Sequence, residues 1–190
     1  MQRRRVVVAW LLALFAGLST AAPSSADMST PYTANFPQEM TVQTTCPPGV
    51  PPPPASFCFT GSDHSGQGTS VPPGTAKPAT EDFTGFVDLT SGIANACPPN
   101  PGSPTRTTGF PDHNQVTIET NAGQLFLTTD GVDCMSTGTD DGVWHAVGGT
   151  GMFRRATGNG TVHTQATGGS GTPADPIRSA STYTGQLVLQ

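Results

Sequence analysis

The sequence QVTIET-NAG-QLFLTT, from Gln115 to Thr129, decides the fold. Apolar and polar side chains alternate in both arms, a period of two that is typical of β-strands with one buried face. The connector holds Asn121 and Gly123, residue types that tolerate the positive φ angles of tight hairpin turns. The stretch therefore predicts an antiparallel β-hairpin, which needs further strands beside it to bury its apolar face.

Further extended segments flank this hairpin, separated by stretches rich in proline and glycine. Threonine, a good strand former, is abundant, whereas Lys77 is the only lysine and good helix formers are scarce. We therefore predict an all-β fold of eight antiparallel strands that closes into a barrel. Closure removes the exposed edge strands, which lysine side chains often protect in open sheets and which this lysine-poor chain could not protect in that way. A β-sandwich is the alternative. The other six segments are 40–45, 56–60, 83–89, 143–147, 160–166 and 181–189.

The first 26 residues have the three-part pattern of a secretory signal peptide. Arg3 to Arg5 precede an apolar run, and small residues end at Ala26, after which we expect cleavage. The apolar run is too short to span a membrane, so no permanent anchor is expected. The sequence thus predicts a secreted, extracellular protein with an N-terminal arm over 27–39 and a barrel domain over 40–190.

The charge of the predicted mature chain is strongly acidic. Removal of Arg3 to Arg5 leaves 5 of the 8 basic residues against 13 acidic residues, a formal charge of −8. Such a surface repels the phosphates of nucleic acids and the headgroups of anionic lipids. Nucleic acids and membrane surfaces are therefore not expected as partners.

Four cysteines, Cys46, Cys58, Cys97 and Cys134, remain in the mature chain. An even number in an exported protein predicts two disulfides, and none of the spacings is as close as zinc sites usually require. Three pairings are possible. We favour Cys46–Cys58 across a proline-rich loop together with Cys97–Cys134 between distant segments, as a preference among the three.

A glycine-rich segment, AVGGTGMFRRATG, covers residues 146–158. Its first three glycines predict a tight turn after a strand, with Phe153 packed beneath the turn. Two guanidinium groups are costly to bury beside this ring, so Arg154 and Arg155 are expected at the barrel rim. The glycines of the turn are Gly148, Gly149 and Gly151, and Gly158 restarts the next strand.

This segment resembles the V-G-G-T-G-x-F-R-x-A-x-G signature of plant dirigent proteins and of the related allene oxide cyclase-like barrels. Secreted actinobacterial proteins of unassigned activity that carry a similar motif look closest in composition. The resemblance implies an eight-stranded antiparallel barrel of the calycin type. Dirigent proteins steer the coupling of phenoxy radicals and allene oxide cyclases close a ring on a fatty-acid epoxide, neither with a cofactor. The resemblance therefore implies a cofactor-free barrel for a small apolar or phenolic molecule.

Two histidines complete the candidate ligand-binding residues at the rim. His145 and His163 lie on the strands that flank the glycine turn, where they could face each other across the ladder. Such a pair could transfer a proton or hold a metal ion, although scattered histidines are more often solvated singly. With Arg154 and Arg155 they form the predicted rim site.

Four aspartates, Asp130, Asp133, Asp140 and Asp141, crowd a predicted polar loop around Cys134. Their oxygens could hold Ca²⁺, but the spacing does not match an EF-hand, and exposed carboxylates are ordinary in turns. The sequence therefore predicts neither a resident metal ion nor a cofactor.

Two functions fit this sequence. The first, which we favour at this level, is a non-catalytic extracellular module whose interior is filled by apolar side chains. The alternative is a barrel that binds a small apolar or phenolic molecule, with dirigent-like or allene oxide cyclase-like steering of a cofactor-free reaction. No catalytic residue is identified. The aromatic side chains available to fill the interior are Phe57, Phe83, Phe86, Phe126 and Phe153.

Overall fold

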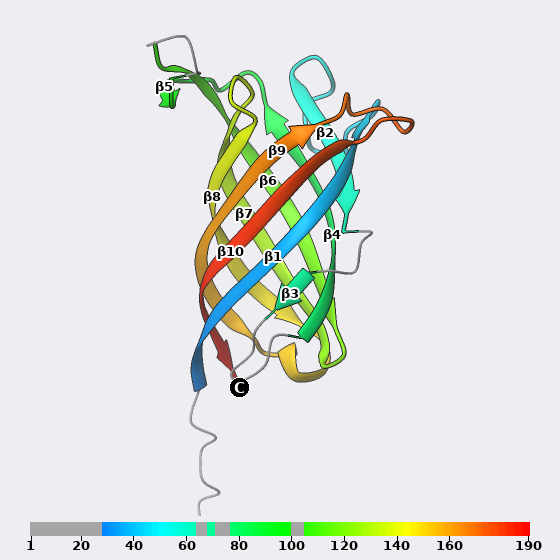
Figure 1. Ribbon diagram of the computed structural model, residues 1–190, viewed down its shortest axis with the longest axis vertical. Coiled ribbons are helices and arrows are strands. Elements are labelled where there is room, and N and C mark those ends of the chain that lie inside the picture. The colour runs from blue at the N-terminus through cyan, green and yellow to red at the C-terminus, as the bar shows by residue number, and fades with distance from the viewer. Residues whose placement is uncertain (1–27, 64–67, 71–76, 100–104) are drawn as a thin grey trace, which may run out of the picture.

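The computed structural model describes residues 28–63, 68–70, 77–99 and 105–190 as one antiparallel β structure (Figure 1). The predicted signal peptide over 1–26 lies outside the described residues. In those residues, helical structure is limited to the 3-10 turn η1 (Gly151–Phe153). The strands are β1 (Met28–Gln43), β2 (Ser56–Ser62), β3 (Gly68–Ser70), β4 (Lys77–Asp88), β5 (Ile93–Cys97), β6 (Thr107–Thr120), β7 (Gly123–Cys134), β8 (Thr139–Gly149), β9 (Thr157–Gly168) and β10 (Ile177–Leu189).

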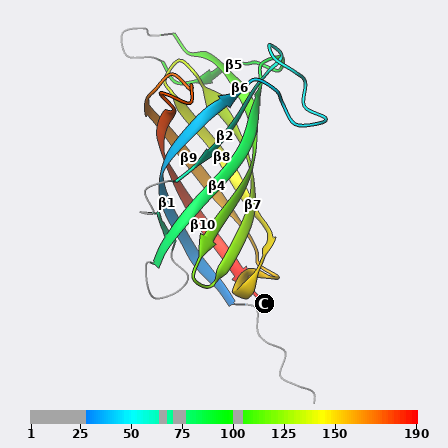
Figure 2. The same cartoon turned by 90° about the vertical axis from the view of Figure 1, so that its right-hand side faces the viewer.

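The sheet closes on itself in a ring. Hydrogen-bonded neighbours run β1, β10, β9, β8, β7, β6, β4, β2 and back to β1, and all of these pairs are antiparallel. The short β3 bridges β1 and β4, and β5 pairs with β6 outside the ring. Two views at right angles show the strands surrounding a central interior (Figures 1 and 2). The predicted all-β antiparallel fold is confirmed.

The structure differs from the N-terminal arm predicted over 27–39, because β1 covers most of that range. Pro31 and Pro37 suggested an arm, since proline has no N–H for a ladder. The N–H of Val42 donates to the Gly171 carbonyl, which lies on the β10 side of β1. Because backbone N–H groups point to alternate sides along a strand, even-numbered residues of β1 direct their nitrogens toward β10 and odd-numbered residues direct theirs away from it. Both prolines are odd-numbered and lie outside the stretches paired with β2 and β3. No ladder hydrogen bond is therefore lost.

An apolar core fills the half of the interior nearest η1. Trp144 on β8 and Tyr32 on β1 lie at the two ends of one row of paired residues. The positions between them are Gly160 and Gly185, so the two rings meet edge to face with centroids 5.4 Å apart. The indole Nε1 of Trp144 donates to the Thr184 carbonyl at 3.2 Å. The rest of the core includes Ala34, Phe36, Ala79, Val116, Ile118, Leu125, Leu127, Phe153, Ala156, Val162, Tyr183 and Leu187.

The glycine-rich segment forms the predicted turn between β8 and β9 and closes this end of the ring. Gly148 and Gly151 have φ angles of 116° and 57°, which side chains disfavour. A Cβ at Gly149 would lie 2.0 Å from the Gln124 carbonyl, so close backbone approach requires glycine there. Phe153 is buried beneath the turn, as expected. We call this the closed end, and the opposite end, with the turns at 135–138 and 169–176, the open end.

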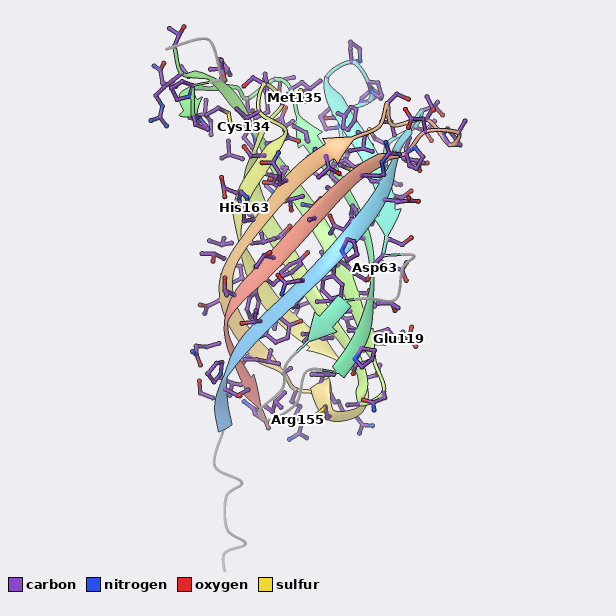
Figure 3. All side chains as sticks on the ribbon, in the orientation of Figure 1. Asp63, Glu119, Cys134, Met135, Arg155 and His163 are labelled. Carbon is purple, nitrogen blue, oxygen red and sulfur yellow. A yellow bond between two sulfur atoms is a disulfide. The ribbon has the colours of Figure 1, made fainter. Side chains whose placement is uncertain are left out.

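Both predicted disulfides are confirmed, and they join segments at the open end. Cys46–Cys58 connects the proline-rich loop to β2, and Cys97–Cys134 connects β5 to the last residue of β7 (Figure 3). No free cysteine remains. Among the described residues, no helix is long and apolar enough to cross a bilayer. These features are compatible with an extracellular protein.

Removal of the Cys97–Cys134 bridge is expected to destabilise the protein more than removal of Cys46–Cys58. The two bridges close stretches of 37 and 12 residues, which the chain-entropy model converts to about 4 and about 3 kcal/mol. The comparison is urea unfolding of the Cys97→Ala/Cys134→Ala and Cys46→Ala/Cys58→Ala double variants. A larger loss from the shorter loop would contradict this account.

Candidate functional site

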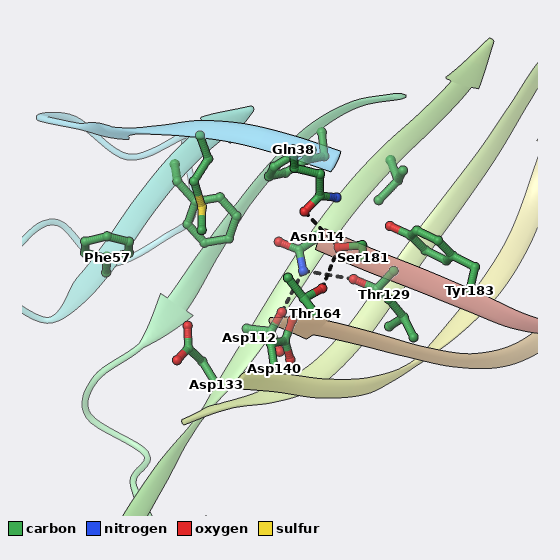
Figure 4. Close-up of a pocket in the computed structure, with 15 residues that line it drawn as sticks. Gln38, Phe57, Asp112, Asn114, Thr129, Asp133, Asp140, Thr164, Ser181 and Tyr183 are labelled. Carbon is green, nitrogen blue, oxygen red and sulfur yellow. Dashed lines mark hydrogen bonds between the residues drawn. The ribbon is translucent and has the colours of Figure 1, made fainter. Parts of the chain in front are cut away.

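The open half of the interior holds polar side chains among apolar ones, and a cavity of about 60 Å³ remains between them (Figure 4). A space of this size accommodates a few water molecules or one small polar group. The lining residues come from β1, β2, β4 and β6 to β10: Gln38, Met40, Phe57, Phe59, Phe83, Asp112, Asn114, Val116, Thr129, Asp133, Asp140, Val162, Thr164, Ser181 and Tyr183.

A wider mouth of about 420 Å³ lies at the open end. Leu89, Met135 and Ile177 give the mouth apolar surface. Its volume is in the range of small-molecule sites. Five residues line both the mouth and the cavity, which therefore adjoin each other: Met40, Phe57, Asp133, Asp140 and Thr164.

Two buried carboxyl groups converge between the cavity wall and β7. Asp112 on β6 and Asp140 on β8 meet over Gly131, where a Cβ would lie 2.5 Å and 2.6 Å from their Oδ1 atoms. Asn114 Nδ2 donates to Asp112 Oδ2 at 2.6 Å. Apart from each other, the two Oδ1 atoms have no hydrogen-bond partner. This pair therefore needs a shared proton or a donor from outside the protein.

Burial raises the pKa values of the carboxyl cluster, which we define as Asp112, Asp133 and Asp140. The pKa of Asp140 rises to about 8 through burial, then through the charges of Asp112 and Asp133. Burial also raises the pKa of Asp112, against the opposing hydrogen bonds from Asn114 and Asp140. The pKa of Asp133 rises to about 6 through burial and the charge of Asp112. The pair formed by Asp112 and Asp140 therefore tends to retain a proton, which the two carboxyl groups share.

A buried network forms the floor of the cavity. Gln38 Nε2 and Tyr183 Oη donate to the two carboxylate oxygens of Glu81, at 2.5 and 2.6 Å. The hydroxyls of Ser179 and Ser181 donate to Gln38 Oε1 at 3.0 and 2.7 Å. Burial raises the pKa of Glu81 to about 7, although the hydrogen bonds from Tyr183 and Gln38 oppose the shift. These bonds hold Gln38 and Tyr183 in fixed positions.

The predicted rim arginines lie far from this cavity. Arg154 and Arg155 follow η1 and are exposed, so they stand at the rim of the closed end. Figure 3 shows Arg155 at the end of the molecule opposite Cys134 and Met135. The two guanidinium groups are therefore not brought together with the cavity or its mouth.

The two predicted histidines are exposed and do not face each other. In the register of β8 and β9, Asn159 lies opposite His145 and Asp141 lies opposite His163. His163 Nδ1 lies 2.6 Å from Asp141 Oδ1, in an exposed pair. The structure therefore brings His145 and His163 into no shared site.

The aspartates predicted in one polar loop over 130–142 lie on β7 and β8. Strand alternation separates them, because Asp133 and Asp140 face the mouth whereas Asp130 and Asp141 are exposed. Asp130 pairs with His113, and Asp141 with His163. The four carboxylates therefore do not converge on one ion. Across the described part of the chain, no group of three His, Cys, Asp or Glu side chains is placed to hold a metal ion.

Three residues of the site and its floor, Asp112, Asn114 and Glu81, were not predicted from the sequence. A signal for the first two was present in the decisive hairpin itself. Val116 and Ile118 face the interior, and continuing their period of two backwards leads to Asn114 and Asp112 on the same face. Polar residues at positions that continue the alternation of a buried apolar face point into the interior, and such residues indicate a functional site there.

Comparisons with known protein families, with curated proteins and with solved structures find no match to this chain. The resemblance to the dirigent signature therefore stays a prediction. Function has to be inferred from the cavity, its mouth and the carboxyl cluster.

Proposed function

We propose that the protein binds a small amphipathic organic molecule at the open end. The polar group of this molecule enters the cavity, and its apolar part lies in the mouth against Met40, Phe57 and Ile177. Phenolic molecules, which the dirigent-like signature implies, belong to this class. We further propose a secreted, extracellular protein, because two disulfides fit an oxidising compartment.

The observation that carries this proposal is the carboxyl cluster beside a cavity that adjoins the mouth. Burying carboxyl groups that are only partly hydrogen-bonded costs free energy that apolar side chains in the same positions would not cost. Strongly perturbed carboxyl groups in a cleft are typical of functional sites. The packed core at the closed end would suit a non-catalytic module, but the open half of such a module has no need for buried acids.

Filling the mouth is expected to weaken binding strongly. The probes are four molecules with one methyl-substituted ring: 4-methylphenol, 4-methylbenzyl alcohol, 4-methylbenzylamine and 4-methylbenzoate. At least one should bind the full mature chain saturably in calorimetry at pH 7. Ala166→Trp places an indole in the mouth, because Ala166 lines it, and should weaken this binding about tenfold or more.

The matched control is Ala180→Trp, on the neighbouring strand β10. Ala180 pairs with Gln165 and is exposed, so the new indole points outward and binding should be unchanged. Melting temperatures of both variants check that they fold. Absence of binding by all four probes, or binding that survives Ala166→Trp in a folded variant, would overturn the proposal.

A further inference from the structure

We propose that Met135 is an oxidation site that controls binding at the open end. A peroxide converts the thioether of this side chain to a sulfoxide, and the mouth then holds its ligand more weakly. This inference rests on the proposed function, because it concerns the same mouth. It adds regulation of that mouth by an oxidant.

The first argument is the accessibility of the Met135 side chain. Met135 is 49% exposed and begins the turn over 135–138 that joins β7 to β8. Figure 3 shows it at the open end, beside Cys134 and opposite Arg155. Met40, the other methionine that lines the mouth, is half-buried and also lines the cavity. Because exposed methionines react with peroxides more readily than buried ones, Met135 is oxidised before Met40.

The second argument is that Met135 gives the mouth apolar surface, together with Leu89 and Ile177. Oxidation places a polar S=O group on this side chain. The lining of the mouth, in the part of the chain that the structure describes, includes no lysine, arginine or histidine to donate to the new oxygen. Water therefore solvates the oxygen best, which favours a side chain turned away from the mouth. The apolar contact that Met135 offers to a ligand is then lost.

The third argument is that the turn is held in place independently of the Met135 side chain. The N–H groups of Thr137 and Gly138 both donate to the Cys134 carbonyl, at 2.9 and 2.8 Å. Cys134 is in turn bonded to Cys97. Met135 does not belong to the apolar core, so its oxidation removes no core packing. Oxidation therefore changes the lining of the mouth without unfolding the protein, and the exposed sulfoxide stays open to reduction.

The oxidation is a two-electron transfer from sulfur to the peroxide. The O–O bond of hydrogen peroxide breaks, one oxygen atom forms the S=O bond with the Met135 sulfur, and the other leaves as water with both protons. The reverse step uses a thiol reductant and a methionine sulfoxide reductase. It breaks the S=O bond, releases the oxygen as water, and leaves the reductant as a disulfide. The modification is thus reversible.

The test treats the full mature chain with hydrogen peroxide, removes the peroxide with catalase, and then measures binding by calorimetry. The probe is the tightest binder among the four methyl-substituted molecules named above. We expect its affinity to fall about threefold or more. Peptide mass spectrometry should find an added oxygen atom on Met135 in proportion to this loss. Treatment with the A and B types of methionine sulfoxide reductase should restore the affinity.

Met152→Leu is the matched control for Met135→Leu. Met152 is 43% exposed, but it lies in η1 at the closed end. Each variant is compared with itself before and after peroxide. Affinity should fall in Met152→Leu as it does in the unmodified chain, and it should hold in Met135→Leu. Met135→Gln, which introduces a polar side chain of similar length, should weaken binding without any peroxide, whereas Met152→Gln should leave binding unchanged.

The outcomes separate this inference from the proposed function. If a probe binds and its affinity is unchanged once Met135 is oxidised, the mouth is a binding site but Met135 does not control it. Equal losses in Met135→Leu and Met152→Leu, or oxidation of Met40 before Met135, also overturn the inference. A fall in melting temperature that accompanies the loss of binding would assign the effect to unfolding instead. If no probe binds the untreated protein, both proposals fail.

Discussion

Replacement of Trp144 by alanine is expected to lower the free energy of unfolding by about 3–5 kcal/mol. The Trp144 side chain is fully buried, packs edge to face on Tyr32, and donates to the Thr184 carbonyl. Gly160 and Gly185 leave the space that the indole occupies, and backbone on both sides prevents that space from collapsing. Urea unfolding followed by circular dichroism measures the loss.

Val147→Ala is the matched control, because Val147 lies on the same strand but is 62% exposed. Its effect should stay within about 0.5 kcal/mol. If Trp144→Ala costs no more than this control, the indole does not hold the closed half of the ring together as described.

Stability is expected to fall as the pH is raised from about 4 to about 8. The folded pKa values of Glu81, Asp133 and Asp140 are about 7, 6 and 8, above their ordinary values of 4.5, 3.8 and 3.8. The folded state thus binds more protons than the unfolded state within this window, so deprotonation favours unfolding. This is the reverse of acid denaturation driven by salt-bridged carboxylates. Melting temperatures across the pH range measure the slope.

Asp140→Asn should raise the melting temperature at pH 8 and flatten the pH dependence, by on the order of a few kcal/mol in unfolding free energy. The amide keeps the size of the side chain but carries no charge to bury. Asp141→Asn, on the exposed face of β8, should leave the slope unchanged. A melting temperature that rises steadily from pH 4 to pH 8 in the unmodified protein would contradict the placement of the carboxyl cluster.

Local sequence pattern predicted strands well where one face is continuously apolar. The hairpin over 115–129 was predicted on this basis, and the structure extends it to β6 and β7 in both directions. The extensions were missed because Asp112, Asn114 and Asp133 occupy inward positions, which a pattern of buried apolar residues excludes. The first part of β1 was not predicted because it contains Pro31 and Pro37. The strand accepts these prolines because their nitrogens point away from β10, and that direction follows from the strand pairing, which the local sequence does not show.

The candidate site was harder to predict, because it depends on which end of the ring stays open. The glycine-rich motif indicates a turn, and it placed Arg154 and Arg155 at a rim. It carries no information about the opposite rim, where the cavity is formed by residues from eight strands that are far apart in sequence. The contact between Asp112 and Asp140 over Gly131 likewise depends on how β6, β7 and β8 are aligned with one another, which the local sequence does not show.

The pairing of β1 with β10 closes the ring between the two ends of the described chain. Their register joins Met28 to Leu189, so the ring cannot close until the first and last described strands have met. Contacts between such distant residues make folding slow, on the order of milliseconds to seconds for small β proteins. Until β1 docks, the edge of β10 is open to a β1 strand from another molecule, which is the route to domain-swapped dimers. The Cys46–Cys58 bridge limits this exchange, because it tethers the end of β1 to β2 of its own chain.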